Sequence, residues 1–333
     1  MEIDKKNIEA IVFPCTYKCD AKCVMCSIHK RERPQELSVE QIDRVFARDE
    51  ISSIKSINIT GGEPTLRADL VEIFEVIIKR CTQLKEILLN SNGLNTSNIL
   101  KQIECICQVV PKQINFSVYI SLDSMGEDND LIRGVKNATE RVKDTLLNLK
   151  ELSKEYGFNI IISCTVTSYN VEKLEEVLQY AKDNDLYIEF IISTLNSAYI
   201  NSSDTDQKFV IPSDKYDNLI KFLYDALEYE KNVMDRILIE RFENRLNKKK
   251  CINECIFREG KGLLLEADGI IRACGMTGDV QLGHVNEDID WEKLGQYDKY
   301  CSICNTDSYY SFTTSGKYNN AKRLLEKVRE LRG

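Results

Sequence analysis

The 333-residue chain is poor in histidine, with only His29 and His284. Two histidines give no basis for a histidine-based metal site or a hydrolytic triad. No stretch approaches the roughly 18 apolar residues that a membrane span requires, and the chain starts without an apolar signal region. There is no Gly-x4-Gly-Lys-Ser/Thr phosphate loop. The net charge of −8 disfavours a nucleic-acid surface. We therefore expect a cytoplasmic protein without nucleic-acid or membrane partners.

The composition is that of a soluble globular protein, with 43% apolar and 29% charged residues. A chain of this length is too long for one small core. We expect one large domain with a smaller piece, or two domains.

Cysteine is the residue type in excess: there are 13, an odd number. Without a signal sequence, an odd count argues against a disulfide framework. Four cysteines in apolar stretches are expected to be small buried hydrophobes: Cys81, Cys105, Cys107 and Cys164. The other nine gather in two groups, which favours metal binding: Cys15, Cys19, Cys23 and Cys26, then Cys251, Cys255, Cys274, Cys301 and Cys304.

Short β-branched runs alternate with amphipathic stretches in the first part of the chain. The predicted strands are Glu9–Phe13, Ser56–Thr60, Glu86–Asn90, Asn115–Leu122, Asn159–Val166 and Tyr187–Ser193. Helical patterns lie between them, for instance at Leu66–Ile78, Thr139–Tyr156 and Val171–Asn184. Six βα units in a row imply a parallel sheet with helical crossovers, either as a barrel or as an open doubly wound sheet.

Four unusual segments follow the first four strands. They are Cys15–Cys26, Gly61–Pro64, Ser91–Gly93 and Asp123. Ligands bind at the C-terminal ends of parallel strands in both kinds of sheet. The four segments therefore predict an active site at that edge.

The first cysteine group contains Cys19-x3-Cys23-x2-Cys26. Soft thiolate ligands select iron–sulfur clusters or zinc. A structural zinc site would want a fourth ligand, for which Cys15 is available. The spacing alone leaves both readings open.

With Gly61-Gly62-Glu63-Pro64 and the βα order of residues 8–195, this motif resembles the radical S-adenosylmethionine (radical SAM) superfamily. The resemblance implies an α/β fold of the partial (β/α)6 TIM-type barrel kind. It also implies that Cys19, Cys23 and Cys26 hold three irons of a 4Fe–4S cluster. The fourth iron stays open for the amino and carboxylate groups of S-adenosylmethionine, so Cys15 is expected to be a bystander.

The resemblance further implies a set of cofactor contacts. Glu63 is expected to recognise the methionyl amine, and the two glycines before it to allow close approach of the backbone to a ligand. Met25 stands where the family usually has an aromatic residue against the adenine. The full expected set is Met25, Gly61, Gly62, Glu63, Pro64, Asn92, Ser121, Asp123 and Arg133.

The second cysteine group has the pattern Cys255-x13-Gly269-x4-Cys274 followed by Cys301-x2-Cys304. It resembles the Twitch domain of enzymes related to the SPASM group, a shortened C-terminal cluster domain built on a hairpin. The resemblance implies that these four cysteines bind a second, auxiliary 4Fe–4S cluster. Four thiolates also suit zinc. Cys251 is surplus to the pattern.

We expect three regions. Residues 1–212 form the radical SAM core, ending in a polar linker near Asn196–Ser213. Residues 213–250 form a helical connection, and residues 251–333 form a Twitch-type domain with a terminal helix at Asn319–Arg332. A hairpin is predicted around Ala267–Gly269.

The predicted activity is reductive cleavage of S-adenosylmethionine to a 5′-deoxyadenosyl radical that abstracts a hydrogen atom from substrate. A low-potential donor such as flavodoxin or ferredoxin would supply the electron. The favoured substrate is a ribosomally made peptide, although the 18 residues before Cys19 leave no room for a separate peptide-recognition domain. The alternative is a small molecule such as an aminocyclitol or sugar alcohol. A non-catalytic iron–sulfur or zinc protein is the competitor from another class.

Overall fold

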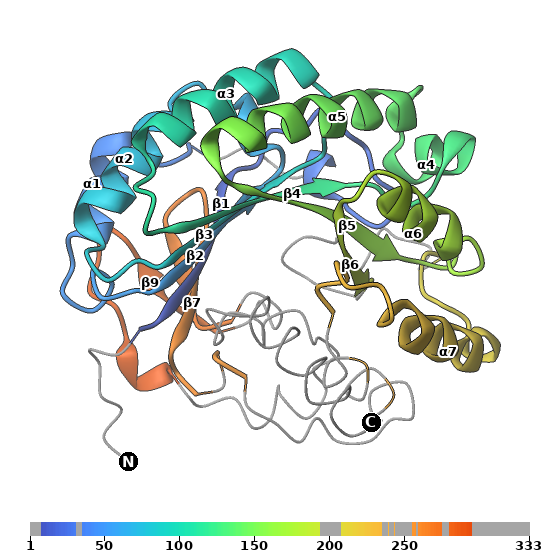
Figure 1. Cartoon of the computed structure of the whole chain (residues 1–333). Coiled ribbons are helices and arrows are strands. Elements are labelled where there is room, and N and C mark those ends of the chain that lie inside the picture. Colours follow the sequence, from blue (N-terminus) through green and yellow to red (C-terminus); the bar gives the residue numbers. More distant parts are fainter. Residues whose placement is uncertain are drawn as a thin grey trace, which may run out of the picture.

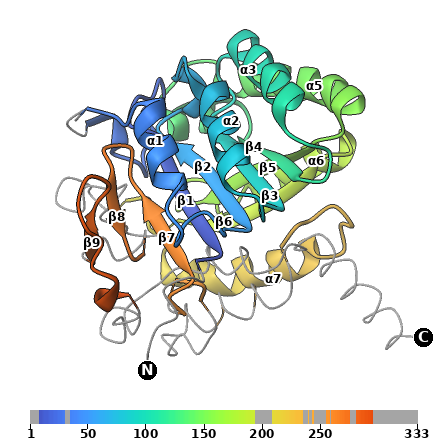
Figure 2. The same cartoon turned by 90° about the vertical axis from the view of Figure 1, so that its left-hand side faces the viewer.

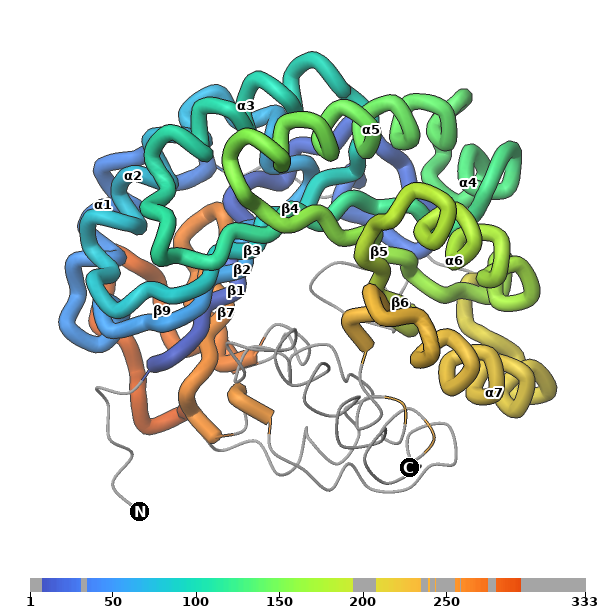
Figure 3. The backbone as a smooth tube through the Cα atoms, viewed as in Figure 1, coloured from blue at the N-terminus to red at the C-terminus, as the bar shows by residue number. Residues whose placement is uncertain are grey.

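The computed structural model describes residues 8–30, 35–193, 208–234, 239, 243, 255–257, 259–274 and 280–294. Within these residues nine strands form one sheet, in the order β6-β5-β4-β3-β2-β1-β7-β8-β9. The sheet curves, and helices cover its convex side (Figure 1). The backbone trace makes the curvature plain (Figure 3).

The first six strands pair in parallel, each with its neighbour along the chain. They are β1 (Ala10–Thr16), β2 (Ser56–Gly61), β3 (Glu86–Ser91), β4 (Asn115–Ser121), β5 (Asn159–Val166) and β6 (Tyr187–Ile192). The predicted strands are confirmed, and their ends differ by a few residues at most. The sheet is not closed, so the expected partial barrel is confirmed.

Helices join the strands as crossovers. They are α1 (Val39–Phe46), α2 (Leu70–Arg80), α3 (Thr96–Val109), α4 (Gly126–Arg133), α5 (Ala138–Tyr156), α6 (Leu174–Asp183) and α7 (Tyr216–Ala226). Short 3-10 turns are η1 (Ile28–Lys30), η2 (Pro64–Leu66), η3 (Ser213–Lys215) and η4 (Trp291–Lys293). The helical patterns singled out in the sequence correspond to α2, α5 and α6. None of the described helices is both long enough and apolar enough to cross a membrane.

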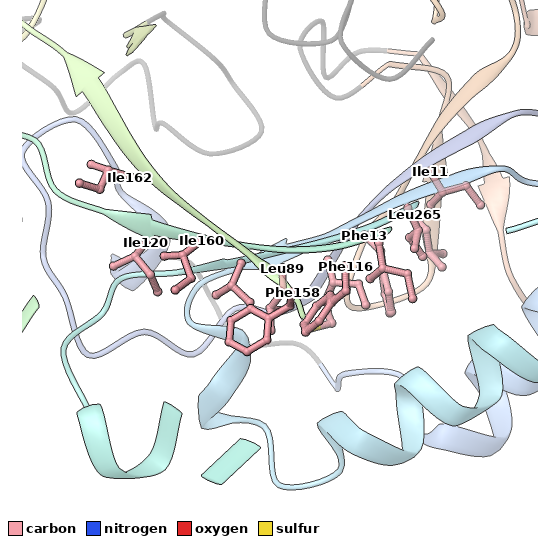
Figure 4. Packing of buried hydrophobic residues seen from close by; sticks show 14 of the residues in the cluster. Ile11, Phe13, Leu89, Phe116, Ile120, Phe158, Ile160, Ile162 and Leu265 are labelled. Carbon is pink, nitrogen blue, oxygen red and sulfur yellow. The ribbon is translucent and has the colours of Figure 1, made fainter. Parts of the chain in front are cut away.

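The two faces of the parallel sheet differ in chemistry. Side chains alternate between faces along a strand, and those on the convex face form an aliphatic and aromatic core with the helices. Figure 4 shows part of this core, including Phe116 and Phe158. The ring of Phe116 contacts those of Phe74 and Phe158, with centroids 5.8 and 5.9 Å apart. The concave face mixes polar side chains with two small apolar clusters, one around Val12 and one around Tyr119. It carries Asn58, Asn90, Ser163 and Glu189, which alternate with residues of the convex core.

The predicted hairpin is confirmed and is continuous with the same sheet. Strand β7 (Gly262–Leu265) pairs in parallel with β1, while β8 (Ile270–Arg272) and β9 (Gln281–His284) follow as antiparallel neighbours. Figure 2 shows these strands beside β1. The three-region division stays a prediction. The structure adds that the C-terminal hairpin shares main-chain hydrogen bonds with the first strand.

Candidate active site

The loop after β1 carries Cys19, Cys23 and Cys26, which are all partly buried. Main-chain hydrogen bonds hold one side of this cysteine loop (Thr16–Cys26) to the segment after β2. There, Gly62 N donates to Thr16 O and Glu63 N donates to Lys18 O, both at 2.7 Å.

The other side of the cysteine loop is held by the end of α4. Lys22 N donates to Arg133 O at 3.0 Å, and Val24 N donates to Ile132 O at 2.9 Å. The loop is therefore fixed on both sides before any side chain is considered.

The two glycines at the end of β2 are required by this contact. A Cβ atom on Gly61 would lie 2.3 Å from Thr16 O, and one on Gly62 would lie 2.1 Å from Lys18 O. Both distances are far below van der Waals contact. Gly61 and Gly62 therefore lie close against the cysteine loop. Their approach to a ligand stays a prediction.

Glu63 lies at the centre of the edge, with 1% of its surface exposed. Its Oε2 accepts from Asn92 N at 2.6 Å, and its Oε1 accepts from the Thr65 hydroxyl at 2.7 Å. Burial raises the pKa of Glu63, while these hydrogen bonds oppose the rise. Pro64, which is buried, begins η2 directly after it.

Asn92 connects Glu63 to the first cysteine. Its side-chain Nδ2 donates to Asp20 Oδ1 at 2.6 Å and lies 4.0 Å from Cys19 Sγ. The predicted residues Cys19, Glu63 and Asn92 therefore meet at one edge, although they follow three different strands.

Arg133 and Asp123 form a buried ion pair on the far side of the loop. Arg133 Nη2 lies 2.7 Å from Asp123 Oδ2, and Arg133 Nη1 lies 3.8 Å from Cys23 Sγ. Burial raises the pKa of Asp123 and Arg133 lowers it, with burial dominating. Burial alone would lower the pKa of Arg133, but Asp123 and Cys23 raise it above its ordinary value.

The remaining predicted residues lie near this edge. Met25 is buried with Ile132 and Phe209. Ser121 ends β4 and pairs in register with Ser163 of β5.

Arg67 was not predicted, yet it holds the end of β1, directly before the cysteine loop. Its guanidinium donates to Cys15 O at 2.6 Å and to Leu37 O, and it pairs with Asp69 at 2.7 Å. The side chain is 7% exposed. Nothing in the sequence distinguishes it from a surface arginine in a βα turn, because its main-chain acceptors are distant in sequence.

Asp123 depends on two further residues that the sequence did not single out. Thr165 N donates to Asp123 Oδ1 at 2.7 Å, and Asn170 Nδ2 donates to Asp123 O at 2.6 Å.

Cys15 does not join the three loop cysteines. It is buried in the convex core with Ile11 and Phe13, and burial raises the pKa of its thiol to about 12. Among the described residues, no three His, Cys, Asp or Glu side chains converge as ligands of a single metal ion would. The place of Cys15 in the convex core disfavours a zinc site that uses its thiol.

The three loop thiols fit a multi-iron cluster, in which each thiolate bonds to a different iron. Burial raises the pKa of Cys19 to about 11 and that of Cys26 to about 12, so ligation must displace their protons. Arg133 supplies positive charge beside Cys23, and its buried Nε has no hydrogen-bond partner among the described residues. A bound anionic group would satisfy it.

Of the second cysteine group, Cys255 and Cys274 are described. Both belong to an apolar cluster with Ala10, Val12 and Leu264 on the concave side of β1 and β7. Cys251, Cys301 and Cys304 lie outside the described residues, as does the predicted terminal helix.

A sequence profile described as the Radical SAM superfamily matches residues 13–194, more than half of the chain. The chain belongs to the radical SAM superfamily. It is therefore an enzyme of a family that uses a 4Fe–4S cluster and S-adenosylmethionine, and that requires a reductant and a substrate.

Radical SAM relatives with different substrates resemble this chain. The probable GTP 3′,8-cyclase of Methanocaldococcus jannaschii is 25% identical over 242 residues, covering 68% of this chain and 76% of that protein. The sporulation killing factor maturation protein SkfB of Bacillus subtilis is 27% identical over 175 residues, covering 52% of this chain and 39% of that protein.

Two solved structures share the fold. The structure of anSMEcpe with bound AdoMet has a TM-score of 0.62 at 20% identity, covering 91% of this chain and 82% of that chain. Streptococcus suis SuiB bound to precursor peptide SuiA has a TM-score of 0.59 at 16% identity, covering 93% and 67%.

Gly134 and Gly157 provide a matched test of how α4 supports the cysteine loop. Both end a helix in the left-handed region, at φ 64° and 79°. A Cβ at Gly134 would lie 2.4 Å from Lys22 O, whereas one at Gly157 would meet nothing within 4 Å. Gly157→Ala should cost about 1–2 kcal/mol of backbone strain. Gly134→Ala should cost about 1–3 kcal/mol more.

Gly134→Ala should also lower the iron bound per chain after reconstitution, because the clash falls on the cysteine loop. Urea unfolding of both variants, with iron analysis, checks this. Equal stability losses and equal iron contents would contradict the assigned role of α4.

Proposed function

We propose that this radical SAM enzyme binds its catalytic 4Fe–4S cluster through Cys19, Cys23 and Cys26 and modifies a ribosomally synthesised peptide. The observation that carries the cluster assignment is that the three thiols, Glu63 and Arg133 occupy one edge of the parallel sheet. That is the edge at which such folds bind ligands.

The side chains at the edge suit the two ends of the methionyl group. Glu63 is proposed to recognise the ammonium group, as the family resemblance implies, and its carboxylate is held in place by Asn92 and Thr65. Arg133 is held against Asp123 and offers guanidinium donors to a carboxylate. Asn92, Ser121 and Met25 complete the proposed contacts. Gly61, Gly62 and Pro64 act by shaping the loop.

When bound, the cluster and S-adenosylmethionine supply a 5′-deoxyadenosyl radical that abstracts a hydrogen atom. The protein orients the reactants and excludes water. The electron would come from a low-potential donor such as flavodoxin or ferredoxin.

Cys255, Cys274, Cys301 and Cys304 are proposed to bind an auxiliary 4Fe–4S cluster in a SPASM/Twitch-type C-terminal region. Cys255 and Cys274 support this because they share one apolar cluster on the concave side of β1. Full ligation by four thiolates leaves no iron open for S-adenosylmethionine. This cluster would instead bind substrate or accept an electron.

The concave face supports a peptide over a nucleoside triphosphate. On this face, the described strands β1 to β6 carry amides, hydroxyls, apolar groups and the carboxylates Glu86 and Glu189, but no Lys, Arg or His. A triphosphate requires cationic groups or metal to balance its charge. A peptide backbone needs only hydrogen-bonding partners, which Asn58 and Asn90 supply.

A small neutral or amine-bearing molecule, such as an aminocyclitol or sugar alcohol, is the second candidate because the same face suits it. The non-catalytic carrier is set aside by family membership.

Cofactor cleavage tests the first cluster. The protein reconstituted without oxygen should release 5′-deoxyadenosine when given S-adenosylmethionine and dithionite. Changing Cys19, Cys23 and Cys26 to Ala should abolish release, because no thiolate remains to hold the cluster. Cys15→Ala is the matched control and should retain release, since Cys15 belongs to the convex core. Release by the triple variant would refute the ligand assignment.

Metal analysis tests the second cluster. Wild type should bind about eight irons, the count for two 4Fe–4S clusters. The triple variant at the first motif should keep about four. A Cys301→Ala, Cys304→Ala variant should lose the auxiliary cluster while keeping some uncoupled cofactor cleavage. A wild type with about four irons and one zinc would leave a structural zinc site in place of the second cluster.

The charge of the concave face predicts the response to GTP. Mg–GTP should not accelerate 5′-deoxyadenosine release and should not be consumed. Chromatography of nucleotides after turnover, run beside an authentic GTP 3′,8-cyclase, measures both. Consumption of GTP would overturn the peptide assignment and leave the catalytic cluster untouched.

A further inference from the structure

Tyr17 joins the cysteine loop to the C-terminal hairpin. Its ring is 1% exposed and packs with Ile28 and Ala267, and Cys19 and Cys26 pack against the same cluster. Ala267 belongs to the turn between β7 and β8. A single aromatic side chain therefore touches both the first cysteine motif and the hairpin.

The hydroxyl of Tyr17 extends this contact into a buried polar network. It donates to Glu266 Oε2 at 2.5 Å and lies 3.4 Å from Asp268 Oδ1. Glu266, which is 2% exposed, forms an ion pair with Arg272 of β8.

The network connects residues that lie close in sequence to the two cysteine groups. Tyr17 stands two residues before Cys19, and Arg272 stands two residues before Cys274. A main-chain hydrogen bond from Leu37 N to Ala267 O, at 2.7 Å, holds the same turn. Displacement of the hairpin would pull directly on the loop that carries Cys19.

We propose that Tyr17 is a positioning residue that couples the cysteine loop to the β7–β8 hairpin through Glu266, so that the hairpin sets both the order of the loop and the redox behaviour of its cluster. The redox part rests on the proposed function, since it requires a cluster on Cys19, Cys23 and Cys26. The reduction potential of such a cluster responds to nearby charge, hydrogen bonding and solvent exposure.

Two variants separate the hydrogen bond from the charge. Tyr17→Phe keeps the ring and the Glu266 carboxylate but removes the hydroxyl. Glu266→Gln keeps an acceptor for the hydroxyl but removes the negative charge. Tyr180→Phe is the control, because its buried hydroxyl has no hydrogen-bond partner among the described residues.

Hydrogen–deuterium exchange of the reconstituted full chain measures loop order. In Tyr17→Phe, the segments 17–26 and 262–274 should exchange together, about tenfold faster than in wild type, as the loss of one hydrogen bond to a charged group implies. Glu266→Gln should change exchange less. Tyr180→Phe should match wild type in both segments.

Electron paramagnetic resonance measures the redox part, because only a cluster that binds S-adenosylmethionine changes its signal when that compound is added. Potentiometric titration of this signal should give a more positive midpoint in Glu266→Gln, since a buried negative charge is lost. In Tyr17→Phe the electron paramagnetic resonance signal should broaden, because the cysteine loop then adopts more than one conformation around the cluster.

Exchange and midpoint unchanged in both variants would overturn the coupling. If wild type gives no signal that responds to S-adenosylmethionine, the proposed function fails, and exchange alone then decides whether Tyr17 links the two segments.

Discussion

Main-chain hydrogen bonds on both sides of the cysteine loop are the constraint on which the site depends. Beyond Thr16 the loop has no regular secondary structure, yet Gly62 and Glu63 hold one side, and the end of α4 holds the other. A loop fixed in this way loses little conformational entropy when it binds a ligand. These main-chain hydrogen bonds fix the backbone of the loop. The positions of the glycines, of the Glu63 carboxylate and of the Arg133 ion pair relative to the cysteines depend on that backbone.

The sequence predicted the edge but not its supports. Strand periodicity and the C-terminal edge rule were enough to bring Cys19, Glu63 and Asp123 together, because each lies next to its own strand. Arg67 and Tyr17 were missed because their partners are distant in sequence: Arg67 reaches Leu37, and Tyr17 reaches Glu266. Spacing cannot reveal such contacts. The glycines were identified, but the backbone they approach became visible only in the fold.

The difference between the two sheet faces explains how one fold both holds together and leaves room for chemistry. A closed barrel of eight strands fills its interior with branched aliphatic side chains. Here the aliphatic layer lies on the convex face against the helices, where Phe116 and its neighbours pack. The concave face does not have to form the aliphatic core. Asn58, Asn90 and Glu189 can therefore occupy positions that would be core positions in a closed barrel.

The pairing of β1 with β7 has a consequence for synthesis of the chain. Ala10 pairs with Gly262, so the partner of the first strand emerges roughly 250 residues later. At about 5–20 residues per second, β1 waits on the order of 12–50 s for that neighbour. During this time one edge of β1 has no hydrogen-bonded neighbour. All the side chains of β1 are buried in the finished fold. Open edges invite pairing with other chains. Nascent chains of this enzyme are therefore exposed to pairing with other chains at this edge until the hairpin has been synthesised.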